Sequence, residues 1–241
     1  MPAENTSVQP GEKSIDYFSK GHPLTRFRSH FAWRARQAML ECFMSTFSIG
    51  PNSKVLDIGV TPDTSLRESN HFEQRFPYPA NLTATSIEGI DNLKARFPEV
   101  TFLRTGPGRL PFEDGQFDAV FCSAVIEHVG SCRSQAAFMA ELSRVARGFM
   151  LTTPNRWYPL EFHTILPVIH WLPREKHRAL LRLIGKDFWS NAENLNLMSA
   201  GDLRRAAPQG VELHVDHVKL MGWPSNLIAW GKREDAAKSK G

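Results

Sequence analysis

The fold class of this 241-residue chain follows from the stretch Val55–Asp63, V-L-D-I-G-V-T-P-D. It has the pattern of a fully buried strand that ends near Asp57, with a tight turn at Gly59. A nucleotide-binding turn would normally continue with further glycines, but Thr61 and Asp63 stand at those positions. Such glycines let a pyrophosphate approach backbone N–H groups closely, so their absence counts against NAD, FAD and ATP.

Strand and helix patterns alternate around this stretch. Short apolar runs predict strands, and amphipathic runs between them predict helices. This alternation implies right-handed crossovers and a parallel sheet covered on both faces. The expected strands are Lys54–Gly59, Leu82–Ile87, Val100–Thr105, Ala119–Ser123 and Phe149–Thr153, and the expected helices are Arg26–Phe47, Ile90–Phe97 and Gln135–Ala146.

The pattern changes after Thr153. Residues 154–198 contain several prolines, many aromatic residues and the basic amphipathic run Glu175–Lys186, and this is too long for a plain connection. We therefore expect a helical cap insert over the edge of the sheet. Beyond it, we expect a short helix through Ala206 that Ser199 caps, with Asp202 three residues on as a variant capping box. A strand pair is expected at Val211–Val218 and Asn226–Gly231.

Composition is that of a folded globular protein. Hydrophobic residues make up 41% and charged residues 22%, which is too apolar for a disordered chain. The net charge of +4 is mild, and it favours solvated helix faces over a nucleic-acid or anionic-membrane footprint. The three cysteines show no paired metal spacing, and their odd count argues against a disulfide framework. The first residues lack an apolar signal region, so we expect a cytoplasmic protein.

The length suits a single domain. We expect an α/β domain over residues 26–232, with the cap insert at about 154–198. Residues 1–25 are expected to form a flexible arm or lid, and residues 233–241 a mobile tail. The sequence leaves the oligomeric state open.

Three pieces recur in a fixed order: V-L-D-I-G at 55–59, R-L-P-F-E-D-G-Q-F-D-A-V-F at 109–121, and S-A-V-I-E-H-V at 123–129. Together they resemble the class I S-adenosylmethionine-dependent methyltransferases, in particular the type 11-like branch of bacterial small-molecule enzymes that includes quinone methyltransferases. The resemblance covers about Lys54–Thr153. It implies a doubly wound, mostly parallel seven-stranded sheet, the Rossmann-like methyltransferase fold.

The resemblance also implies S-adenosylmethionine as the cofactor, which has no phosphate and depends less on the missing glycines. Asp57 and Gly59 would hold its methionine part, and the backbone of Ser123 and Ala124 would line the same moiety. Tyr17 in the N-terminal arm would fold over the cofactor and exclude water.

Two positions of the cofactor site depart from the family's pattern. Asp63 is either a first-turn acid of a helix that begins with Thr61 as N-cap and Pro62, or a partner for the cofactor's α-ammonium group. The second strand ends in Ser86, where the family has an acid for the ribose hydroxyls. Glu88, on the same face two residues later, either replaces that acid or is an ordinary surface glutamate.

The third strand also lacks the family's acid for the adenine amino group. That contact is either lost or supplied by backbone groups near Arg109 and Leu110. The predicted cofactor-binding residues are therefore Asp57, Gly59, Thr61, Asp63, Glu88, Arg109, Leu110, Ser123, Ala124 and Tyr17.

Candidates for acceptor chemistry follow the fourth and fifth strands, where such folds bind ligands. Methyl transfer is an in-line displacement that needs alignment and, for a poor nucleophile, a base. His128 could deprotonate a hydroxyl or amine, or could join Glu127 in orienting the strand–helix turn. By resemblance to relatives with a helical cover, Asn155, Tyr158 and His163 would belong to the acceptor pocket.

Other side chains of the insert have plainer explanations. Its histidines at 163, 170 and 177 recur every seven residues, but prolines interrupt any continuous helix, so we predict no metal site. Three aromatic residues are better explained as the insert's own core: Trp157, Phe162 and Trp171.

Three functions remain open at this point. The first is methyl transfer to an O or N atom of a small-molecule substrate, with no nucleic-acid partner and no stable membrane insertion. The second is cyclisation of the cofactor's methionine part with release of methylthioadenosine, suggested by the unusual turn. The third is a non-catalytic binding protein, suggested by the departures from the family's cofactor site.

Overall fold

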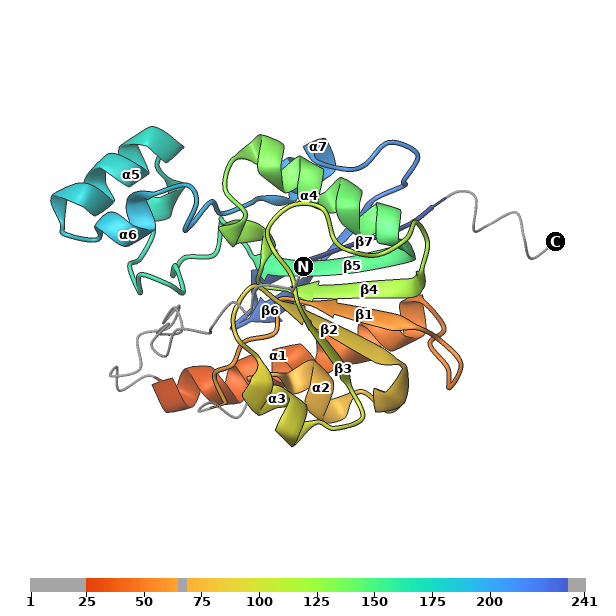
Figure 1. Ribbon diagram of the computed structural model, residues 1–241. Coiled ribbons are helices and arrows are strands. Elements are labelled where there is room, and N and C mark those ends of the chain that lie inside the picture. The colour runs from red at the N-terminus through yellow and green to blue at the C-terminus, as the bar shows by residue number, and fades with distance from the viewer. Residues whose placement is uncertain (1–24, 65–68, 234–241) are drawn as a thin grey trace, which may run out of the picture.

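The computed structural model describes residues 25–64 and 69–233, with backbone only for 25–32. Its centre is a seven-stranded sheet in the order β3-β2-β1-β4-β5-β7-β6 (Figure 1). Strands β1 to β5 pair in parallel, whereas β7 runs antiparallel to both β5 and β6. The expected doubly wound, mostly parallel sheet is confirmed. Its strands are β1 Val55–Ile58, β2 Leu82–Ser86, β3 Thr101–Arg104, β4 Phe117–Ser123, β5 Ala146–Pro154, β6 His214–Leu220 and β7 Trp223–Lys232.

Helices cover both faces of the sheet, with α1–α3 on one side and α4 and α7 on the other (Figure 1). Successive β4 residues serve opposite cores, because strand side chains alternate between faces. Val120 packs with Met139 of α4, and Phe121 packs with Phe43 of α1. The helices are α1 Thr25–Thr46, α2 His71–Arg75, α3 Asp91–Arg96, α4 Cys132–Val145, α5 Arg174–Leu183, α6 Asp187–Ser190 and α7 Ala200–Arg205, with 3-10 turns η1 Pro79–Asn81, η2 Ile126–His128 and η3 Ile169–Trp171.

Of the two alternatives for Thr61-Pro62-Asp63, the helix start is wrong. Residues 61–64 are not helical, and α2 begins only at His71. The Thr61 hydroxyl accepts a hydrogen bond from the Asp63 amide at 3.2 Å, which closes a turn instead of capping a helix. The Asn70 side chain then holds this loop, since its amide group bonds both the N–H and the C=O of Thr61.

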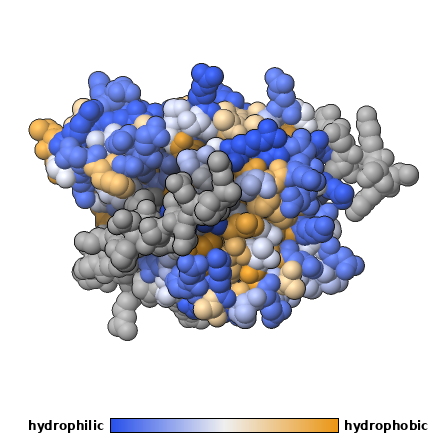
Figure 2. Space-filling view, in the orientation of Figure 1, coloured by the Kyte–Doolittle hydropathy of each residue, from blue (hydrophilic) through white to orange (hydrophobic). Residues whose placement is uncertain are grey.

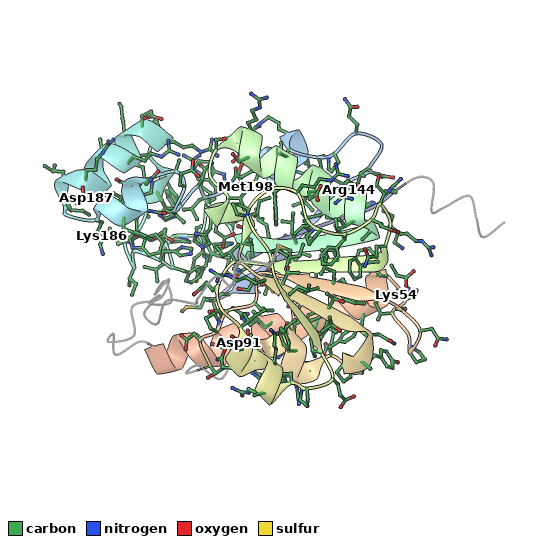
Figure 3. The ribbon with its side chains drawn as sticks, viewed as in Figure 1. Lys54, Asp91, Arg144, Lys186, Asp187 and Met198 are labelled. Carbon is green, nitrogen blue, oxygen red and sulfur yellow. The ribbon has the colours of Figure 1, made fainter. Side chains whose placement is uncertain are left out.

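The insert after β5 leaves the sheet and returns to the same place. Asn155 at its start forms a β-bridge with Met198 at its end, so the two ends lie side by side. Helices α5 and α6 form a lobe beyond the carboxyl end of β5, with Lys186 in the connection between them and Asp187 at the start of α6 (Figure 3). In the view of Figure 2, hydrophilic side chains cover most of this lobe.

The predicted start of α7 is confirmed in detail. The Ser199 hydroxyl accepts from the Asp202 amide, and the Asp202 carboxylate accepts from the Ser199 amide at 2.9 Å. This reciprocal pair is a capping box, which satisfies two backbone donors at a helix start.

Candidate active site at the carboxyl edge of the sheet

The turn after β1 depends on Gly59. Its φ of 96° is unfavourable for other residues, and a Cβ atom there would lie 2.2 Å from Val125 Cγ2. The amides of Gly59 and Val60 donate to the carbonyl of Thr85 at 2.9 and 3.1 Å. The turn is therefore clamped between the end of β2 and the segment after β4, and both neighbours belong to the same edge of the sheet.

Asp57 lies beside a second buried acid, Glu73 of α2. Burial raises the pKa of Asp57 well above its ordinary value, and the neighbouring Glu73 raises it further, while Arg36 opposes both effects. Burial likewise raises the pKa of Glu73. Both Glu73 oxygens lack a hydrogen-bond donor among the described residues, so a hydrogen bond between the two carboxyls requires that they share a proton. Sequence reasoning missed Glu73, because α2 is too short to show a clear period.

The other predicted cofactor-binding residues differ in how well the structure fits their expected roles. Glu88 is half-buried, and its amide donates to the Ser86 hydroxyl at 3.1 Å, so both residues stand at the end of β2. Arg109 is exposed. Leu110 does not fit the predicted adenine contact, because its amide already donates to Glu141 at 2.7 Å and its side chain lies in the α4 core. Tyr17 lies outside the described residues, as do most of the arm and tail.

Strand β4 ends in a strained turn. Ala124 has φ 57°, a left-handed conformation that costs free energy in a residue with a side chain. Two contacts to Thr152 of β5 support it: the Ala124 amide donates to the Thr152 carbonyl, and the Ser123 and Thr152 hydroxyls are bonded, each at 2.9 Å. The turn aims the following residues across the carboxyl ends of β4 and β5.

Those residues enter a buried network. Glu127 is completely buried, and one of its oxygens accepts a hydrogen bond from the Thr153 hydroxyl at 2.9 Å. The His128 ring Nδ1 donates to the carbonyl of Asn194 at 2.6 Å. The His163 ring packs edge-to-face against His128 with centroids 5.0 Å apart, and its Nδ1 bonds Glu161 at 2.7 Å. Two predicted site residues, 35 positions apart in the sequence, are thus brought together.

Burial and hydrogen bonds together set the charges of the side chains in this network. Burial alone would raise the pKa of Glu161, but bonds from His163 and Thr164 outweigh it and lower the pKa to about 2. Burial lowers the pKa of His128 to about 4. Burial raises the pKa of Glu127. At neutral pH the network therefore contains an ionised Glu161 and a neutral His128 ring.

Asn155 and Tyr158 are not directed into this network by any hydrogen bond of the structure. The Asn155 side chain bonds the Pro224 carbonyl and the Trp157 amide, which fixes the start of the insert. Tyr158 is buried and stacks on Phe162. The expectation that Trp157 and Trp171 belong to the insert's core is wrong, because these residues are 49% and 38% exposed.

The sequence of residues 56–148 matches a family model described as a methyltransferase domain. The match runs from β1 to the start of β5. Two curated relatives, described as probable S-adenosylmethionine-dependent methyltransferases of Mycobacterium tuberculosis strains, are 36% identical over 70 residues. The match covers 28% of this chain and 24% of each relative, so the chain spans about a quarter of the length of the curated relatives it matches.

Solved structures share the fold of this chain. Magnesium protoporphyrin IX methyltransferase from Synechocystis PCC 6803, with bound SAH, superposes with a TM-score of 0.58 at 14% identity over 90% of this chain and 91% of that chain. The YcgJ protein from Bacillus subtilis gives 0.53 at 15% identity over 82% of this chain and 99% of that chain.

Two further observations concern the insert and the helices. A small hollow lies within the insert, lined by Arg156, His170, Arg174 and His177 among others, and not by the strand ends. Within residues 25–64 and 69–233, no helix combines the length and the apolar character needed to cross a membrane.

Proposed function

We propose that this chain is an S-adenosylmethionine-dependent methyltransferase that acts on an O or N atom of a small molecule. One observation carries the proposal. Residues 56–148 match a methyltransferase domain, and strands β1, β2 and β4 of this region end at one edge of the sheet, where the Gly59 turn meets Val125. Folds of this type bind their ligands at that edge. A cytoplasmic location and one domain over residues 26–232 are parts of the same proposal.

The cofactor would lie across the turn after β1. Asp57 and Gly59 would hold its methionine part, Asp63 would pair with the α-ammonium group, and Glu88 would bond the ribose hydroxyls. The absence of further glycines matters little here, because the Gly59 and Val60 amides already bond Thr85 and no phosphate has to reach them.

The reaction would be a displacement at the sulfonium methyl carbon. The acceptor's lone pair forms the new bond, the carbon–sulfur bond breaks towards sulfur, and the acceptor's proton leaves to a base. His128 is the candidate base: with its Nδ1 hydrogen directed to Asn194, the neutral ring carries its lone pair on Nε2. The insert would exclude water from the acceptor, with His163 and Tyr158 near it.

Calorimetric titration with S-adenosylhomocysteine and S-adenosylmethionine tests the proposal. We expect micromolar binding by the wild-type chain, lost in Asp57→Ala and retained in a control, Asp118→Ala, whose side chain is 39% exposed in a surface ion pair. Products separate the chemistries, since transfer releases S-adenosylhomocysteine and cyclisation releases methylthioadenosine. No binding of either ligand would rule out both reactions.

A further inference from the structure

Three potential ligand atoms converge beside the proposed acceptor site. Glu127, His128 and His163 each offer one, and these atoms all lie within 4.8 Å of one another. Two imidazoles and one carboxylate are a donor set that divalent transition-metal ions prefer. We propose that these three residues bind such an ion, with zinc as the best match to a tetrahedral site that keeps one open position.

Hydrogen bonds orient both rings for this role. Each histidine uses Nδ1 for an acceptor of the protein: His128 for the Asn194 carbonyl at 2.6 Å and His163 for the Glu161 carboxylate at 2.7 Å. A neutral imidazole with its hydrogen on Nδ1 carries its lone pair on Nε2, which is the ligating form. Metal-binding histidines are commonly held in this way, by a backbone carbonyl or a carboxylate behind the ring.

The carboxylate partner of His163 is itself fixed. Both Glu161 oxygens accept hydrogen bonds, one from the His163 amide and ring, the other from the amide and hydroxyl of Thr164. Glu161 thus stays ionised behind the ring, with no oxygen to spare as a ligand. This arrangement accounts for a charged group at 2% exposure, since an ionised carboxylate is costly to bury without such donors.

Glu127 supplies the second observation. It is 0% exposed, and only one of its oxygens is bonded, by the Thr153 hydroxyl. The other oxygen, Oε1, has no hydrogen-bond partner in the part of the chain that the structure describes. A buried unsatisfied carboxylate oxygen is unfavourable, and coordination to a cation would satisfy it.

The cluster's surroundings favour a reactive ion over a purely structural one. The Trp189 ring lies 5.1 Å from the His163 ring and forms an apolar wall. Glu127 is two residues from Val125, which touches the Gly59 turn, so the ion would adjoin the proposed cofactor site. Three protein ligands leave a position for a further oxygen or nitrogen ligand.

This inference rests on the proposed function and deepens it. With its Nε2 on the ion, His128 would be a ligand, and the ion would take over the activation of the acceptor that the proposed function assigns to a base. The ion would bind the acceptor's oxygen and lower the pKa of its hydroxyl, so that the proton passes to solvent as the acceptor binds. The substrate class would then be a small molecule with a metal-binding oxygen at the atom to be methylated.

Metal titration of the full chain tests the inference without any turnover. After dialysis against a chelator, the chain is titrated with Zn²⁺ by calorimetry and with Co²⁺ by visible absorption. We expect one equivalent of Zn²⁺ per chain and a Co²⁺ spectrum typical of nitrogen and oxygen ligands. Glu127→Gln keeps the shape and the Thr153 contact but loses the charge, and its Zn²⁺ affinity should fall at least about 10–100-fold.

His170→Gln is the matched control, because His170 is an equally buried histidine of the insert outside the cluster. It should bind Zn²⁺ as the wild type does. Should Glu127→Gln fail to fold, judged by circular dichroism, His128→Gln replaces it at a half-buried ring. The inference is wrong if the wild type binds no equivalent of Zn²⁺, as a plain hydrogen-bonded network would, or if either cluster variant binds as tightly as the wild type. S-adenosylhomocysteine titrated into the same samples reports separately on the proposed function.

Discussion

The two halves of the carboxyl edge both bury acidic side chains, but the pKa of the buried acid shifts in opposite directions. After β1, Asp57 and Glu73 face each other, and burial together with mutual repulsion raises the pKa of Asp57. After β4 and β5, Glu161 faces imidazole, hydroxyl and amide donors, and its pKa falls to about 2 despite equal burial. Burial alone therefore does not determine the charge of an acid; the groups that face it do.

The largest loss of stability should come from removing the ionised carboxylate of Glu161. Glu161→Ala removes the acceptor of four hydrogen bonds and leaves the His163 ring and the Thr164 hydroxyl without it. We expect the free energy of unfolding to fall by about 3–5 kcal/mol in urea denaturation. Glu175→Ala is the control, because that carboxylate is 85% exposed in its ion pair with Arg178 and should cost less than about 1 kcal/mol. Similar costs for the two variants would contradict a buried, donor-stabilised carboxylate.

Gly59 joins the two halves, and its replacement should have the next largest effect. Gly59→Ala places a methyl group against Val125 in addition to straining φ, for a combined cost of about 2–4 kcal/mol. Gly108→Ala isolates the strain, since its φ of 97° is nearly the same but nothing lies within 4 Å of the added Cβ. Thermal unfolding of both variants measures the difference. Equal losses would mean that the contact with Val125 is not tight.

The raised pKa values of Asp57 and Glu73 predict a pH dependence of stability. An acid whose folded pKa is raised keeps its proton after the unfolded chain has lost it, so stability falls as pH rises from about 4 towards the folded pKa. Glu73→Gln removes one of the two carboxyls, with Arg36 left to face Asp57. We expect the variant to be more stable than wild type by about 1 kcal/mol at pH 8, with the gain shrinking towards pH 5 in urea denaturation.

Glu99→Gln provides the reference for that pH series, because Glu99 is exposed on the surface. Its stability relative to wild type should not change between pH 5 and pH 8. A gain in Glu73→Gln that is as large at pH 5 as at pH 8 would argue against a shared proton.

The smallest loss of stability is expected at the start of α7, outside the carboxyl edge. It shows what a single local hydrogen bond contributes. Ser199→Ala removes the hydroxyl that caps α7, at an expected cost of about 1 kcal/mol. Ser199→Asp should retain most of the stability, since aspartate is also a good N-cap. Urea denaturation of the two variants distinguishes the cap from mere loss of packing, because only the alanine variant should be destabilised.

Local patterns were enough to predict the sheet, the seven strands and the capping box of α7. Each of these depends on residues close together in the chain: apolar runs of strand length, alternating helical periods, and a serine three positions before an acid. The same locality explains one failure, since Thr61-Pro62-Asp63 satisfies the rules for a helix start. The side chain of Asn70, nine positions away, holds it as a loop.

By itself, the sequence determined the fold and led to the prediction of a ligand site at the carboxyl edge. Only the tertiary structure decided the partners of the residues on that edge. Glu73 comes to Asp57 from a separate helix, and His163 comes to Glu127 and His128 from the insert. Charge and ligation depend on distances of a few ångströms between side chains that are remote in the chain, and no local pattern encodes those distances.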